Sequence, residues 1–186
     1  PKVRALPVSG IPDGLDLEAI SVVDDNHVWV GTESREAERK EDFLFLLKLD
    51  QDHANKIDVL RFPYRQFTQA PPNLNRSNRG VEGLCHTGSD LYVATEAPLL
   101  LASGKRFAML SRYNFQSKTW TPFYLALNSK KGKISALSCS SSSPIAAPSI
   151  FAVERHYDIS RIIGFTVPSN LEPEQFLEST ETVDLS

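Results

Sequence analysis

An internal repeat constrains the fold of this chain more than any other feature of its sequence. Residues 16–34 read DLEAISVVDDNHVWVGTES, and residues 78–97 read NRGVEGLCHTGSDLYVATEA. The acidic position at Glu18 matches Glu82, and the hydrophobic run that ends in T-E is present in both copies. Self-similarity at a period of roughly 60 residues indicates a fold built from repeated structural units.

A third, degenerate copy lies in the C-terminal part of the chain. KISALS at 133–138 matches the first half of the pattern, with Ser135 where the second copy has Glu82. IFAVE at 150–154 matches the second half. The Ser- and Pro-rich stretch 140–148 between them predicts a lengthened hairpin loop, because such clusters interrupt strands.

Each copy continues into two further apolar runs, so every unit contains four. The runs are short, rich in β-branched and aromatic residues, and bounded by Gly, Asn, Asp and Pro, as strands are. The charged stretch 35–42 is interpreted as a loop. The third and fourth runs of the three units are Phe43–Asp50 and Ile57–Phe62, Phe107–Asn114 and Trp120–Leu125, and Ser160–Val167 and Thr182–Leu185.

Tandem four-stranded units predict an all-β fold of the β-propeller class. We expect one partial domain over 1–186, with about three four-stranded antiparallel blades at approximately 13–63, 78–126 and 133–186. A β-sandwich with coincidental similarity is the alternative all-β interpretation.

Three blades are too few to close a ring, because propellers typically have four to eight. We therefore expect half, or another fragment, of a six-bladed ring. The outer faces of an open ring would expose apolar surface, so the expected partner is a second copy of the chain or the missing remainder of the propeller.

Composition excludes several other classes of function. The chain has 186 residues, a formal net charge of −3 and no long Lys/Arg block, so neither nucleic acid nor a membrane surface is an expected partner. No apolar run is long enough to span a bilayer, and residues 1–10 lack the pattern of a signal peptide. The sequence contains no G-x-S-x-G, H-E-x-x-H, P-loop or C-x-x-C motif.

The two cysteines do not make a disulfide framework. Cys85 and Cys139 lie on the first strands of neighbouring blades, three and four residues after the repeated acidic position, so alternation points them to opposite sides. We expect two buried free thiols. Trp29 and Trp120 are expected to be core or blade-packing residues, and His156 is expected in a solvated loop.

The repeated acids fall at the ends of the two inner strands of each blade. Glu18 and Glu82 begin first strands, whereas Glu33, Glu96 and Glu154 end second strands. Because the start of one antiparallel strand lies beside the end of its partner, all five carboxylates should gather at one face of the ring, near its axis. Whether the acids of one blade point to the same side depends on hairpin register, which the sequence leaves open.

The loop 71–80 should lie over the same face, and it supplies Asn and Arg side chains that include Asn78 and Arg79. Carboxylates with amide oxygens suit a hard cation such as Ca²⁺. Arginines beside such a cation suit a phosphate or carboxylate ligand. In the alternative, architectural interpretation, the glutamates accept backbone N–H bonds or pair with Arg79 and Arg155 to hold the blades together.

These motifs resemble the phytase-like domain family, also called the esterase-like activity of phytase family. The matching stretches are Asp13–Glu33, Asn78–Leu99 and Ile134–Arg155, and N-R-G-V-E-G-L at 78–84 is the most specific. The resemblance implies a propeller, a secreted or periplasmic location, hydrolysis of phosphoesters or carboxyesters, and metal binding by the central acids. The chain departs from the family in being too short for a whole ring and in lacking the channel Glu in its third copy.

Two functions from different classes follow. The first is a metal-assisted, phytase-like or esterase-like hydrolase of phosphorylated or ester substrates, with Ca²⁺ as the expected cofactor and no catalytic residue assigned. The second is a non-catalytic propeller that binds a small anionic ligand or a protein on the same face. The metal is assigned to Glu18 and Glu82, and ligand binding to Asn78, Arg79, Glu33, Glu96, Glu154 and Arg155.

Overall fold

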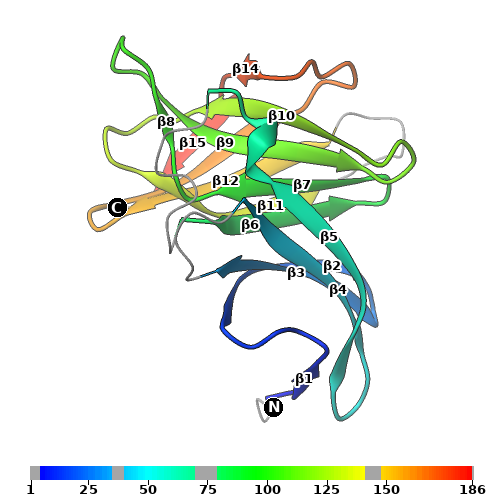
Figure 1. Cartoon of the computed structure of the whole chain (residues 1–186). Coiled ribbons are helices and arrows are strands. Elements are labelled where there is room, and N and C mark those ends of the chain that lie inside the picture. Colours follow the sequence, from blue (N-terminus) through cyan, green and yellow to red (C-terminus); the bar gives the residue numbers. More distant parts are fainter. Residues whose placement is uncertain (1–4, 35–39, 70–78, 141–147, 186) are drawn as a thin grey trace.

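The computed structural model of the chain describes residues 5–34, 40–69, 79–140 and 148–185. Three β-sheets follow one another along the chain (Figure 1). The first sheet, in blue to cyan, has the strand order β1-β5-β4-β3-β2. Its strands are β1 (Val8–Ser9), β2 (Leu15–Asp24), β3 (His27–Ser34), β4 (Glu41–Leu49) and β5 (Ala54–Pro63), and a short 3₁₀ turn, η1 (Tyr64–Gln66), follows them.

The second sheet has the order β14-β10-β9-β7-β6, with the short β8 paired to β9; β6 to β10 are green to yellow-green, and β14 is orange-red. Its strands are β6 (Val81–Thr87), β7 (Asp90–Thr95), β8 (Leu99–Leu100), β9 (Arg106–Asn114), β10 (Thr119–Ala126) and β14 (Gln175–Leu177). The third sheet has the order β11-β12-β13-β15 and consists of β11 (Lys133–Ser140), β12 (Ser149–His156), β13 (Ile159–Thr166) and β15 (Glu181–Asp184).

Each sheet therefore contains a four-stranded antiparallel unit, and the all-β propeller fold predicted from the repeat is confirmed. Three short strands were not predicted, and one of them, β8, is a two-residue strand that pairs with β9. β1 adds to β5 in parallel, and β14 leaves the third unit to add in parallel to β10 of the second. In the part of the chain that the structure describes, no helix has the length and apolar character of a membrane span.

Most of the core lies in two apolar layers between consecutive sheets, and a smaller cluster that includes Phe45 lies on the first sheet's outer face. Trp29, Leu44 and Phe62 of the first sheet pack against Val81 and Leu84 of the second. The second layer joins the other face of the second sheet to the third, with Tyr92, Leu110, Phe123, Ile150 and Phe165 among its members. Trp29 is buried and Trp120 packs against the first layer, as predicted for both.

The outward faces of the two terminal sheets carry exposed apolar side chains. On β2, Ile20 is 65% exposed and Val22 is 68% exposed. On the third sheet, Val183 of β15 is 53% exposed, and Phe151 of β12 is also exposed. Part of the first sheet's outer face is covered by the N-terminal segment, where Ile11 packs near it.

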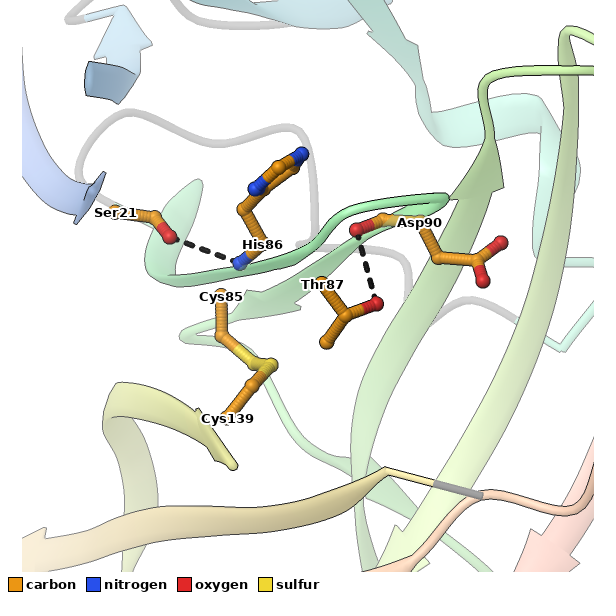
Figure 2. The surroundings of a disulfide bond; sticks show 6 residues. All are labelled: Ser21, Cys85, His86, Thr87, Asp90 and Cys139. Carbon is orange, nitrogen blue, oxygen red and sulfur yellow. Dashed lines mark hydrogen bonds between the residues drawn. A yellow bond between two sulfur atoms is a disulfide. The ribbon is translucent and has the colours of Figure 1, made fainter. Parts of the chain in front are cut away.

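The prediction of two free thiols was wrong, because Cys85 and Cys139 form a disulfide between β6 and β11 (Figure 2). Strand alternation does place them on opposite sides of their blades. Cys85 lies in the layer facing the third sheet, whereas Leu84 faces the first. Because blades stack face to face, the side of β6 that carries Cys85 faces the side of β11 that carries Cys139. The alternation that was taken to separate the thiols is what brings them together.

Candidate functional site

The site face is the surface where the first strand of each blade begins and its second strand ends. Its residues are 15–18, 33, 79–82, 95–96, 128–135 and 154–158. In the three ladders, Leu15 pairs with Ser34, Val81 with Thr95, and Lys133 with Arg155. The first strands β2, β6 and β11 lie beside one another in this order, so the three hairpin ends are neighbours.

A β-bulge recurs at the same position in all three blades. The ladder register shifts between Leu17 and Ala19, between Val81 and Gly83, and between Ile134 and Ala136. The residues inserted by these shifts are Glu18, Glu82 and Ser135, which are the aligned positions of the repeat. A bulge leaves its extra residue outside the ladder and redirects its side chain. It also decides the hairpin register that the sequence left open.

Close packing between neighbouring blades depends on two glycines, Gly31 on β3 and Gly83 on β6. A Cβ on Gly31 would lie 2.6 Å from Cγ1 of Val81, and one on Gly83 would lie 2.9 Å from Cγ of Leu137. Both distances are shorter than real Cβ contacts. Glycine thus lets the hairpin of one blade approach the first strand of the next and holds the bulge residues near each other.

Glu82 occupies the centre of the site face. It is half-buried, and this burial is the main reason why its pKa is raised above the ordinary value. Lys133 opposes the rise in pKa, Glu18 and Glu33 add to it, and Arg155 opposes it more weakly. Charges from the first and third blades therefore act on the Glu82 carboxyl of the second blade.

Glu33 connects the first blade to the beginning of the second. Its side chain is 1% exposed, and the backbone N–H of Gly80 donates a 2.7 Å hydrogen bond to its Oε2. Gly80 immediately precedes β6 and also accepts a 2.9 Å hydrogen bond from the backbone N–H of Glu96. A buried charge-assisted bond of this kind fixes the position at which β6 begins.

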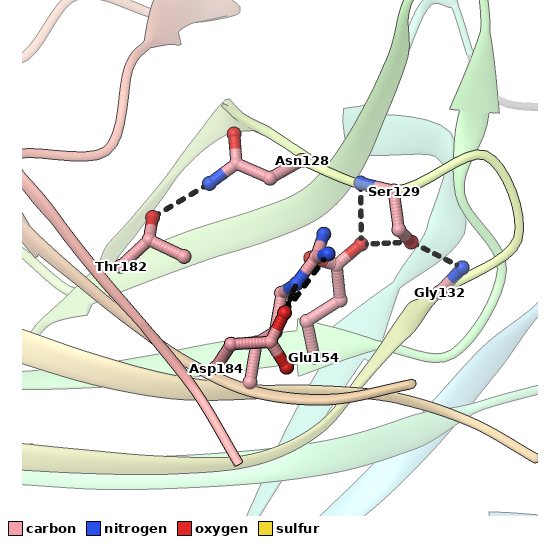
Figure 3. A network of polar contacts seen from close by, with 7 residues as sticks. Asn128, Ser129, Gly132, Glu154, Thr182 and Asp184 are labelled. Atoms are coloured by element: carbon pink, nitrogen blue, oxygen red, sulfur yellow. Dashed lines mark hydrogen bonds and ion pairs between the residues drawn. The ribbon is translucent and has the colours of Figure 1, made fainter. Parts of the chain in front are cut away.

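Glu96 and Glu154 make the corresponding contacts around the third blade. The Glu96 carboxylate forms an ion pair with Lys133 at the start of β11. Glu154 is 0% exposed, and its Oε1 accepts hydrogen bonds from the backbone N–H of Ser129, at 3.1 Å, and from the Ser129 hydroxyl (Figure 3). The second-strand glutamates thus make the architectural contacts, although the cationic partner of Glu96 is Lys133 rather than Arg79 or Arg155.

The remaining predicted site residues are more open to solvent. Glu18, Arg79 and Arg155 are exposed, and Arg155 and Glu18 both act electrostatically on Glu82. Asn78, with most of the loop 71–80, lies outside the described residues.

The described residues offer a limited set of metal ligands. Among them, no group of three or more His, Cys, Asp or Glu side chains converges so as to hold a metal ion. The bulge acids Glu18 and Glu82 supply two carboxylates. Two carboxylates match the way Mg²⁺ is held together with substrate phosphates, but Ca²⁺ takes six to eight oxygens and needs further donors.

Sequence reasoning identified Arg79 and Arg155 but missed Lys133 and Arg106. Lys133 acts on both Glu96 and Glu82, and Arg106 donates a 3.3 Å hydrogen bond to the carbonyl of Ser129. The available signal was the segment NSKKGK at 128–133, which places two lysines directly before a first strand and a third at its first residue.

Fold and site together define the class of protein: a partial β-propeller with charged bulge residues gathered at one face of its inner strands. The family model of phytase-like proteins, described as esterase-like activity of phytase, matches residues 7–168. The chain therefore belongs to the phytase-like family, and the resemblance found in its motifs is confirmed.

Comparison with solved structures gives more distant likenesses. MPT-4, a mannose phosphorylase from Leishmania mexicana solved in complex with a phosphate ion, is 12% identical, with a TM-score of 0.44 over 93% of this chain and 48% of that chain. The chain thus spans about half the length of this phosphorylase. The C-terminal domain of YpeB from Bacillus megaterium is 8% identical, with a TM-score of 0.20 over 92% of this chain and 88% of that chain. Such TM-scores support no argument about function. A search of curated proteins gave no match.

Proposed function

We propose that this chain forms part of a phytase-like propeller that hydrolyses phosphorylated or ester substrates with the help of a divalent cation. The observation that carries the proposal is the repeated bulge. It sets acids on two adjacent first strands, while the third blade contributes Lys133 and Arg155. Acidic side chains on the first two blades beside basic side chains on the third suit a cation and an anionic group that bind next to each other.

Glu18 and Glu82 would hold the cation, with Ca²⁺ the ion to test first and Mg²⁺ the second. Glu18 contributes to the raised pKa of Glu82, so the two carboxylates repel each other. A cation relieves this repulsion, and its binding is therefore expected to release protons and to stabilise the fold. When bound, such an ion polarises the scissile group and lowers the pKa of a bound water.

The chain's own residues would bind and orient the substrate. Arg79 and Arg155 are exposed on the site face, where their guanidinium groups are available to a phosphate or carboxylate. Glu33, Glu96 and Glu154 would act indirectly, by fixing the positions at which first strands begin. Glu33 contacts the segment before β6, and Glu96 and Glu154 contact the start of β11 and the loop before it.

A non-catalytic binding propeller is the second candidate. It is favoured by the contacts of Glu33, Glu96 and Glu154, which give three of the five repeated acids an architectural role. On this alternative the same face binds a small anionic ligand or a protein without turnover.

Two further features support the wider setting of the proposal. The Cys85–Cys139 disulfide favours an oxidising compartment, in agreement with a secreted or periplasmic location. The exposed apolar faces of the terminal sheets favour association with a second copy or with the remainder of the ring.

Calorimetry combined with activity assays tests the proposal. The thermal midpoints of wild type, Glu18→Gln and Glu82→Gln are measured with Ca²⁺, with Mg²⁺ and with chelator, and the exposed Glu178→Gln serves as the control. We expect a cation-dependent rise for wild type and Glu178→Gln that both site variants lose. The same proteins are assayed with p-nitrophenyl phosphate and p-nitrophenyl acetate. A wild type with equal midpoints in cation and chelator would refute the metal assignment, and absence of turnover on both substrates would favour the binding alternative.

A further inference from the structure

The loop 128–132, which leads into β11, is folded around a buried carboxylate. Oε1 of Glu154 accepts both Ser129 hydrogen bonds, and the backbone N–H of Gly132 donates a 2.7 Å hydrogen bond to the Ser129 hydroxyl (Figure 3). The other carboxylate oxygen of Glu154 is buried and accepts no hydrogen bond from the described residues. The Glu154 charge thus lies beneath the loop rather than at the surface.

Further contacts fix the two sides of this loop. Nη1 of Arg106 donates to the carbonyl of Ser129 at 3.3 Å, and Arg106 also interacts electrostatically with Glu154. Nδ2 of Asn128 donates to Oγ1 of Thr182 at 2.7 Å, which attaches the loop to β15 (Figure 3). The loop is held in one conformation by side chains from three strands.

Gly132 is required for the close wrapping of the loop. A Cβ at this position would collide with Oε1 and Cγ of Glu154 and with the Ser129 hydroxyl. The carboxylate cannot easily move away, because it is buried. Substitution of Gly132 therefore displaces the loop without removing any charge from it.

The charged side chains that this loop presents to solvent are basic. Lys130 and Lys131 are exposed, as is Arg155, whose strand position is directly opposite Lys133. Lys131 acts electrostatically on Asp158 at the tip of the β12–β13 hairpin. Of the acids near the loop, Glu96 and Glu154 are buried, whereas Asp158 is exposed, so the loop's own exposed charges are both positive and one exposed carboxylate lies near them.

We propose that Lys130, Lys131 and Arg155, held by the loop 128–132, form the subsite for the phosphate group of a phosphomonoester substrate. This inference rests on the proposed function and adds to it the location of the anionic group, on the third blade. Lysine ammonium and arginine guanidinium groups bind phosphate through charge-assisted hydrogen bonds. Each such bond accounts for on the order of tenfold in affinity.

Calorimetric titration with inorganic phosphate, in chelator and at low ionic strength, tests the subsite. We expect the double variant Lys130→Ala/Lys131→Ala to weaken phosphate binding by about 10- to 100-fold. Gly132→Ala should weaken it although every basic residue is kept. Lys48→Ala, an exposed lysine at the other end of its sheet, should bind as wild type does. Wild-type binding should also weaken as salt is raised.

Wild-type affinity in the double variant, or no phosphate binding by wild type, would overturn the subsite. Should Gly132→Ala fail to fold, the double variant decides alone, because both of its substitutions are at exposed positions. Failure of the subsite and failure of the proposed function give different results. Phosphate binding that depends on the lysines without any turnover keeps the subsite and refutes the hydrolase. Turnover of p-nitrophenyl phosphate with an unchanged KM in the double variant keeps the hydrolase and refutes the subsite.

Discussion

Reduction of the Cys85–Cys139 disulfide should destabilise the protein by a predictable amount. The bond joins the first strands of two blades across a sequence separation of 54 residues. The chain-entropy relation for a closed loop of this length gives about 4 kcal/mol at 25 °C. For a domain of this size, with an unfolding entropy of roughly 2 cal/mol/K per residue, that free energy corresponds to a fall of about 10 °C in thermal midpoint.

Differential scanning calorimetry with and without a phosphine reductant measures this difference. The double variant Cys85→Ala/Cys139→Ala is the matched control, and its midpoint should not respond to reductant. Thiol titration of the unfolded protein should find no free thiol before reduction and two after it, since the described residues contain no unpaired cysteine. Equal wild-type midpoints in both buffers, or two reactive thiols before reduction, would refute the reasoning.

Three other predictions concern the site face and the outer faces. Glu33→Ala leaves the buried N–H of Gly80 without its acceptor and should lower the free energy of unfolding by about 3 kcal/mol. Glu33→Gln keeps an acceptor and should lower it by about 1 kcal/mol. Urea unfolding measures both values, and a protein that tolerates both substitutions would indicate that Glu33 only binds a ligand. The raised pKa of Glu82 favours the protonated carboxyl in the folded state, so its stabilising effect is complete below the unfolded pKa of about 4.5 and is lost as pH rises through the folded value. In chelator, Glu82→Gln should match wild type near pH 4 and exceed it in thermal midpoint at pH 7, and a constant difference between the two proteins across this range would contradict the assignment. Ile20→Asp/Val22→Asp should abolish concentration-dependent association in analytical ultracentrifugation, and a wild type that sediments as a monomer at every concentration would contradict that expectation.

Local sequence patterns predicted the strands because short runs of β-branched and aromatic residues suit the pleated, half-buried surface of a sheet. Runs such as Phe43–Asp50 and Phe107–Asn114 are β-branched, aromatic and apolar, and they form β4 and β9. The three strands that were missed, β1, β8 and β14, are two, two and three residues long. Strands this short carry little periodic signal, and their pairing depends on where the chain returns in space.

The disulfide and the contacts of the basic residues could not be predicted from the sequence, because they join residues of different blades. Strand alternation assigned Cys85 and Cys139 to opposite sides correctly, but the distance between them follows from the stacking of blades face to face. The ion pair of Lys133 with Glu96 likewise joins two blades. No pattern within one repeat reports which residue of the next repeat will lie opposite it.

The sequence by itself determined the number of units, their strand order and the face on which the repeated acids gather. These properties depend on a period and on the antiparallel connection of consecutive strands, which are both encoded locally. Only the tertiary structure decided which glutamates fix the blades and which remain exposed. The position of Glu18 and Glu82 depends on a one-residue bulge, and the burial of Glu33 and Glu154 depends on segments 47 and 25 residues away. Bulges and interblade contacts arise from the packing of whole sheets, because the free energy that selects them becomes available only when neighbouring blades meet.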